Sequence, residues 1–100
     1  MLQRNRRPTT PGRILIEHYL KPRGITITAF AEAVGVSRKH MSKVVHGSSR
    51  VEADLATKMA TVLGTTPKFW LNLQNAVDLY DAQERTKGWK PKAHYPALTD

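Results

Sequence analysis

The 100-residue chain contains no cysteine, which excludes disulfides, thiolate metal ligands and cysteine nucleophiles and is compatible with a reducing cytoplasm. It also lacks any long run of apolar residues, so the sequence predicts no segment that crosses a membrane. The opening residues, MLQRNRRPTTPG, do not contain the apolar stretch of a signal peptide. We therefore expect a cytoplasmic protein that makes no contact with a membrane.

Recognisable catalytic and metal-binding patterns are missing as well. The sequence has no glycine-rich phosphate-binding loop, and its serines stand in no known nucleophile motif. No two histidines lie four residues apart on a predicted helix with a carboxylate ligand nearby, which is the spacing expected of a helical zinc site. The four histidines are His18, His40, His46 and His94. We predict no catalytic residue, no metal and no cofactor.

Acidic residues are scarce in the first half of the chain. Residues 1–50 contain ten Lys and Arg but only two Asp and Glu, whereas residues 51–100 contain six of each kind. A positive field confined to one part of a protein attracts polyanions, which are nucleic acid first and then acidic proteins or anionic lipid. The first half is therefore the expected electrostatic binding face.

Apolar residues recur at helical spacing along most of the chain, and no strand-like alternation is present. Thr10 and Thr66 each precede a proline, which is typical of a helix start because the hydroxyl caps the helix and proline suits its first position. Glycine marks the predicted helix ends. We expect one small all-α domain with five helices. These helices cover about residues 11–20, 27–34, 37–46, 55–63 and 67–81.

The segments outside this pattern are polar. Residues 1–9 contain Arg4, Arg6 and Arg7 and are expected to form a flexible basic arm. Residues 10–82 form the expected domain, and residues 83–100 form an irregular C-terminal tail interrupted by Pro91 and Pro96.

Residues 27–46, ITAFAEAVGVSRKHMSKVVH, are typical of a helix-turn-helix. Two helices that cross closely need a small residue where they touch and a glycine where the chain reverses. Ala31 and Gly35 meet these two needs. The positions that must be apolar for the pair to close on a core are also filled, by Phe30, Val34, Val36, Met41 and Val44.

The second helix of this pair has a basic face. At 100° per residue, Met41 and Val44 point to one side, whereas Lys39 points away from them, with Arg38 and Lys43 on its flanks. Such a face fits the major groove, where Arg38 and Lys39 are the best candidates to bind guanine, with phosphate as an alternative partner for Arg38. The alternative is a solvated surface. The full set of candidate DNA-binding residues is Ser37, Arg38, Lys39, Ser42, Lys43, Thr26, Thr28 and Arg50, of which the threonines have helix capping as an alternative role.

The segment TTPKFWLNLQNAVDLY contains more apolar residues than a DNA-binding unit needs. Phe69, Leu73 and Val77 form a stripe that can close the core, and Trp70 is predicted to lie on another face. Core packing is one explanation of this helix, and a dimer or partner interface is the other.

Together, these segments resemble the HigA-type (VapI-type) antitoxins of the lambda-repressor-like helix-turn-helix class. The resemblance covers about residues 8–82 and rests on PGRIL, on FAEAVGVSRKHMSKVVHG and most specifically on FWLNLQNAVDLY. It implies a five-helix domain that binds double-stranded operator DNA as a homodimer, represses its own operon and neutralises a HigB-type toxin, a ribosome-dependent mRNA endonuclease.

By this resemblance, the candidate DNA contacts of residues 37–43 lie in the matching recognition helix. It also implies a dimer interface formed by Phe69, Trp70, Leu73 and Val77. The chain departs from the pattern at Ile27, where many relatives have a polar residue such as glutamine, and at His46, where asparagine is frequent. Two other functions stay open at this point: a free-standing regulator without a toxin, and a module that binds an acidic protein or RNA. An enzyme ranks last.

Overall fold

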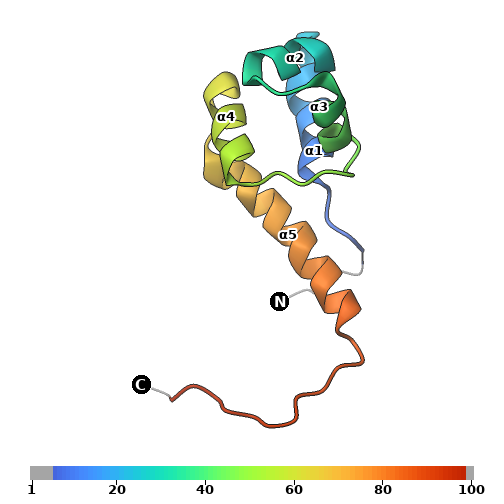
Figure 1. Cartoon of the computed structure of the whole chain (residues 1–100), viewed down its shortest axis with the longest axis vertical. Helices are drawn as coiled ribbons and strands as arrows, with labels where there is room; N and C mark the ends of the chain where they lie inside the picture. The colour runs from blue at the N-terminus through green and yellow to red at the C-terminus, as the bar shows by residue number, and fades with distance from the viewer. Residues whose placement is uncertain (1–5, 99–100) are drawn as a thin grey trace.

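The computed structural model describes residues 6–98, and helices are the only regular elements in that range. The α-helices are α1 (Pro11–Ile14), α2 (Ile27–Val34), α3 (Arg38–Val45), α4 (Ala53–Leu63) and α5 (Pro67–Arg85). The first helix continues from α1 through a π-helical turn, Leu15–Leu20, and a 3-10 turn, Lys21–Arg23. As Figure 1 shows, α1 to α4 gather at one end of the molecule and α5 extends away from them. The predicted all-α class with five helices is confirmed.

Four of the five helices begin at the side-chain cap that the sequence predicts. The hydroxyl oxygens of Thr10, Thr26, Ser37 and Thr66 accept a hydrogen bond from the backbone amide three residues later, at 3.0 to 3.2 Å. Each bond satisfies one of the amide groups that a helix start leaves without a partner. The α4 start has no such bond at Glu52, which explains why the sequence marks it poorly.

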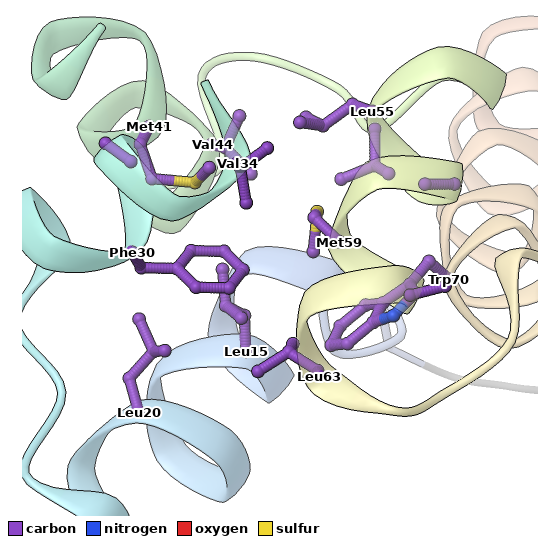
Figure 2. Close-up of a cluster of buried hydrophobic side chains, with 14 residues drawn as sticks. Leu15, Leu20, Phe30, Val34, Met41, Val44, Leu55, Met59, Leu63 and Trp70 are labelled. Atoms are coloured by element: carbon purple, nitrogen blue, oxygen red, sulfur yellow. The ribbon is translucent and has the colours of Figure 1, made fainter. Parts of the chain in front are cut away.

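Side chains from all five helices or the turns that follow them form one core. Trp70, Phe30, Met41 and Met59 are among its largest fully buried members. Figure 2 shows Phe30 and Leu15 near the centre, with Trp70 on the side of α4 and α5. The core therefore fixes α3 against α1 and α2 and leaves the opposite face of α3 exposed to solvent.

The register of α5 differs from the prediction. Trp70 is 0% exposed, and its ring packs on Tyr19 at a centroid distance of 5.4 Å while Nε1 donates to Thr65 Oγ1 at 2.8 Å. Phe69 is 37% exposed and covers the edge of this aromatic cluster. The prediction that Phe69 faces the core and Trp70 another side is wrong, because the larger ring takes the inward position and finds a partner for its N–H group there.

Gly12 allows α1 to approach α3 closely. A Cβ atom at this position would lie 1.9 Å from the carbonyl oxygen of Val44, which belongs to the backbone of α3. No side chain fits at that distance unless one of the two helices moves. The position of α3 on the core thus depends on a glycine in the first turn of α1.

We expect Gly12→Ala to reduce the free energy of unfolding by about 1–3 kcal/mol or more, because the added methyl group overpacks a backbone contact. Urea unfolding followed by circular dichroism measures the loss. Gly88→Ala is the matched control, since a Cβ atom there would meet no atom within 4 Å. Equal stability of the two variants would contradict the close contact between α1 and α3.

Candidate nucleic-acid interface

Helices α2 and α3 meet at a three-residue turn that begins at Gly35. Gly35 adopts φ 85°, a left-handed conformation that glycine reaches at little cost, and its N–H donates to the Ala31 carbonyl oxygen at 2.8 Å. Ala31 itself is 1% exposed. Figure 1 shows α2 and α3 side by side at the end of the molecule away from the chain termini. The arrangement is that of the predicted helix-turn-helix.

The two faces of α3 differ as the helical spacing predicts. Met41 and Val44 are buried in the core, whereas Arg38, Lys39 and Lys43 are exposed. Ser42 lies between the two faces and is half-buried. The helix contains no acidic residue, so its outward face carries positive charge along its whole length.

Arg38 is held in place by the preceding helix. Its Nε atom donates to Thr28 Oγ1 at 2.9 Å, which connects the first turn of α3 to the first turn of α2. The terminal nitrogens of the guanidinium group keep their N–H groups for another acceptor. A long side chain that is fixed before binding loses less conformational entropy when it contacts a base or a phosphate.

The hydroxyl groups of Thr26 and Ser37 act as helix caps, the alternative role that the sequence left open for Thr26. At the other end of α3, His46 Nδ1 lies 2.7 Å from the Ser42 carbonyl oxygen, which also accepts a hydrogen bond from the backbone N–H of His46 at 3.0 Å. His46 thus closes the helix locally.

Arg50 follows α3 in the loop to α4, and its charge is paired. Its two terminal nitrogens donate to the two carboxylate oxygens of Asp78 at 2.9 and 2.6 Å. This bond lowers the pKa of Asp78 below its ordinary value. A bidentate pair reduces the attraction of Arg50 for phosphate, so the structure provides less support for a DNA contact here than for the residues of α3.

Gln74 completes the connection between this loop and α5. Its Oε1 atom accepts from the buried amide of Val51 at 2.8 Å, and its Nε2 atom donates to Asp78 Oδ1 at 3.0 Å. Sequence reasoning missed both Gln74 and Asp78. The available signal was their spacing of four residues on α5, although nothing in the sequence says which loop they face.

The basic arm is partly attached to the domain. Arg7 donates through Nε and Nη2 to the two carboxylate oxygens of Asp81 at 2.9 and 3.0 Å, and this bond lowers the pKa of Asp81. Arg6 is exposed, and Arg4 lies outside the described residues. The two bidentate pairs line one hollow between the start of α1, the loop after α3 and α5.

Stability is expected to fall in acid because of these pairs. The folded pKa values of Asp78 and Asp81 lie below the ordinary 3.8, so their stabilisation is present above pH 3.8 and is lost as the pH falls through the lowered values. Urea unfolding between about pH 5 and pH 2 measures this dependence. The double variant Asp78→Asn with Asp81→Asn should show a flatter profile. Glu17, which is paired with Lys21 and also has a lowered pKa, accounts for the acid dependence of stability that remains in the double variant. A double variant with the same pH profile as the wild type would contradict the assignment of this dependence to Asp78 and Asp81.

The residues predicted for a dimer interface are not equally available. Trp70 and Val77 are buried within the protomer, whereas Phe69 is exposed at its edge and Leu73 is half-buried. The most exposed apolar side chain of α5 is Leu79, at 59%. It lies nine residues from Trp70, about 180° around the helix. Trp70 has no surface to offer a partner, and Leu79 was missed because the predicted stripe did not include it.

In the part of the chain that the structure describes, no three His, Asp or Glu side chains come together as a possible metal site. Between residues 6 and 98, no helix combines the length and apolarity needed to cross a membrane.

Comparison with known proteins agrees with this geometry. The family described as "Helix-turn-helix" matches residues 16–70. The chain belongs to the helix-turn-helix family. This is a family of non-enzymatic regulators, as the lack of catalytic motifs predicts.

Within the helix-turn-helix family, the chain is similar to antitoxins. It is 46% identical to antitoxin HigA-1 of Vibrio cholerae over 85% of this chain and 80% of that protein. A solved structure of antitoxin GraA in complex with its operator has a TM-score of 0.80 and 34% identity and covers 95% of this chain and 100% of its own. The Pseudomonas aeruginosa antitoxin HigA, solved with the higBA promoter, has a TM-score of 0.81 and 29% identity over 92% and 100% of the two chains. The predicted resemblance to HigA-type antitoxins is confirmed.

Proposed function

We propose that this protein is a cytoplasmic HigA-type antitoxin that binds operator DNA as a homodimer, represses its own operon and neutralises a HigB-type toxin. The observation that carries the DNA-binding part is the outward face of α3, where Arg38, Lys39 and Lys43 are exposed opposite the buried Met41 and Val44. Similarity to two antitoxins solved with their own DNA supports it.

In this proposal, α3 lies in the major groove with its N-terminal turn toward the base edges. Arg38 and Lys39 donate to the O6 and N7 acceptors of guanine, and Lys43 and Ser42 contact bases or backbone further along the groove. The first turn of α2, with Thr28, approaches a phosphate. Arg50 contributes mainly through the loop that it holds, because its charge is paired with Asp78.

A homodimer would present two copies of α3 related by a two-fold axis, so the operator is expected to be an inverted repeat. The exposed Phe69 and Leu79 of α5 are the apolar residues best placed to join the two copies. The residues that would hold the toxin carry no signature in this chain.

Two measurements test the proposal. A gel shift on the DNA upstream of the reading frame should show retardation that weakens with rising salt, because cationic contacts release counterions. Co-expression with the adjacent reading frame should relieve growth arrest and yield a complex that co-purifies. Operator binding without rescue or complex would instead favour a free-standing regulator, and complex formation without operator binding would favour a protein-interaction module.

A further inference from the structure

Thr28 is the one polar side chain in the first turn of α2, ITAF. Inside α4, Thr57 and Thr61 donate to the backbone carbonyl oxygen four residues earlier, at 2.9 and 3.0 Å, which is a common bond of a threonine within a helix. The residue four positions before Thr28 is Gly24, which precedes the start of α2. The Thr28 hydroxyl group is therefore available to groups outside its own helix.

The Thr28 hydroxyl oxygen accepts a hydrogen bond from the Nε–H group of Arg38 at 2.9 Å. Arg7 and Arg50 are also held by side chains of another element, but their partners are carboxylates. Between residues 6 and 98, no carboxylate forms an ion pair with Arg38. Because the threonine is neutral, Arg38 is oriented while its full positive charge stays available to a ligand.

The same bond selects which edge of the guanidinium group remains. With Nε–H donated to Thr28, the edge formed by the two terminal nitrogens of Arg38 keeps its two parallel N–H groups. This edge matches O6 and N7 of guanine, the two acceptors that guanine presents in the major groove. A hydroxyl group accepts and donates at once, so Thr28 can give its own proton to a phosphate oxygen while it holds Arg38.

We propose that Thr28 is a positioning residue that makes Arg38 read a guanine, while the Thr28 hydroxyl group donates to the phosphate backbone. This inference rests on the proposed function for the existence of an operator, and it decides between guanine and phosphate as the partner of Arg38. Phosphate contacts fix the register of a protein on DNA. The Thr28 bond transmits that register from α2 to the base contact of α3.

The bond between Thr28 and Arg38 is exposed in the free protein. Once α3 enters the groove, the two side chains lie between protein and DNA, where less water competes for their hydrogen bond. A hydrogen bond is stronger in such surroundings than in open water. The contribution of Thr28 is therefore expected in the complex with DNA, and the stability of the free protein should not depend on it.

Thr28→Val removes the hydroxyl group and keeps the shape of the side chain, whereas Thr28→Ser keeps the hydroxyl group. By fluorescence anisotropy, Thr28→Val should bind the operator about threefold to tenfold more weakly than the wild type, the range expected for one hydrogen bond. The loss on random DNA should be smaller. Thr28→Ser should bind both DNAs as the wild type does. Thr61→Val is the matched control, because it removes an exposed hydroxyl group from α4, and it should change neither affinity.

A second measurement resolves the effect by base pair. In a series of operators, one G·C pair of each half-site at a time is replaced by A·T. The pair that Arg38 reads is the one to which Arg38→Ala no longer responds, and its replacement should weaken binding of the wild type about fivefold to 150-fold. Thr28→Val should discriminate less than the wild type at that pair and equally at the others. Adding Thr28→Val to Arg38→Ala should cause no further loss of discrimination there.

The outcomes separate this inference from the proposed function. If the wild type binds the operator and Thr28→Val discriminates at every pair as the wild type does, the positioning role is wrong and operator binding stands. An equal loss on operator and random DNA assigns Thr28 to phosphate alone and also overturns the role, as does a Thr28→Ser variant that behaves like Thr28→Val. An operator without any pair that depends on Arg38 overturns it too. A wild type that binds no operator overturns both.

Discussion

Replacing Arg38 and Lys39 together by alanine is expected to weaken operator binding by about 2–6 kcal/mol, since each side chain that contacts a base contributes about 1–3 kcal/mol. Both residues are exposed in the first turn of α3, and Arg38 is oriented by Thr28. The protein should keep its stability, because neither side chain is buried. Fluorescence anisotropy with an operator fragment and with random DNA, at the same salt concentration, measures the change.

Lys58→Ala combined with Lys68→Ala is the matched control. It also removes two positive charges, from exposed positions on α4 and α5, and so has the same effect on net charge. We expect a much smaller loss in the control, similar for the operator and for random DNA. An equal loss of affinity in both double variants would show that the charges of Arg38 and Lys39 act only through the overall electrostatic field of the protein. A loss in the α3 variant that is the same for both DNAs would assign Arg38 and Lys39 to phosphates.

Trp70→Ala is expected to cost about 3–5 kcal/mol of the free energy of unfolding. The indole ring is fully buried against Tyr19, and its N–H group donates to Thr65, so the change leaves a cavity and an unpaired hydroxyl group. A small domain has only about 5–15 kcal/mol in total, and the variant should therefore unfold at a far lower urea concentration, or fail to fold at 25 °C.

Phe69→Ala is the control for this prediction. Phe69 is the adjacent aromatic residue, but it is 37% exposed and lies at the edge of the cluster. It should cost about 1 kcal/mol, which is typical of a partly exposed contact. A larger loss of the free energy of unfolding for Phe69→Ala than for Trp70→Ala would contradict the register of α5. It would instead support the predicted apolar stripe, in which Phe69 faces the core.

The sequence predicts most helix starts because caps are local. A threonine or serine hydroxyl reaches an amide three residues away, so the signal at Thr10, Thr26, Ser37 and Thr66 needs no knowledge of the rest of the fold. The buried face of α3 is also predictable, because only Met41, Val44 and Val45 are apolar in that helix. Local chemistry and a clear apolar period are sufficient in these cases.

The register of α5 could not be predicted in the same way. Phe69, Trp70, Leu71 and Leu73 are so close together that several faces of the helix are apolar, and the choice depends on Tyr19, about fifty residues away along the chain. The end of α5 was predicted too early for a different and local reason. Residues 82–85 favour a helix and no stop signal precedes Thr86, so α5 continues to Arg85, beyond the expected end near residue 81.

The pairing of Arg50 was equally hidden. Its partner Asp78 is 28 residues away, and Gln74 connects both to Val51. Helix propensity and the spacing of apolar residues contain no information about which carboxylate pairs with which guanidinium group across a folded domain. The same limit explains why Leu79 was missed, because its exposure depends on where the core lies.

A dimethyl sulfate footprint of the DNA upstream of the reading frame, which reports whether guanine N7 is covered in the major groove, tests the central claim, that α3 binds an operator in the major groove, most directly. The predicted result is protection of two half-sites related by an inverted repeat, with centres about one helical turn apart, and loss of both in the Arg38→Ala, Lys39→Ala variant. Uniform protection along the fragment, or no protection even at low salt where cationic contacts are strongest, would contradict it.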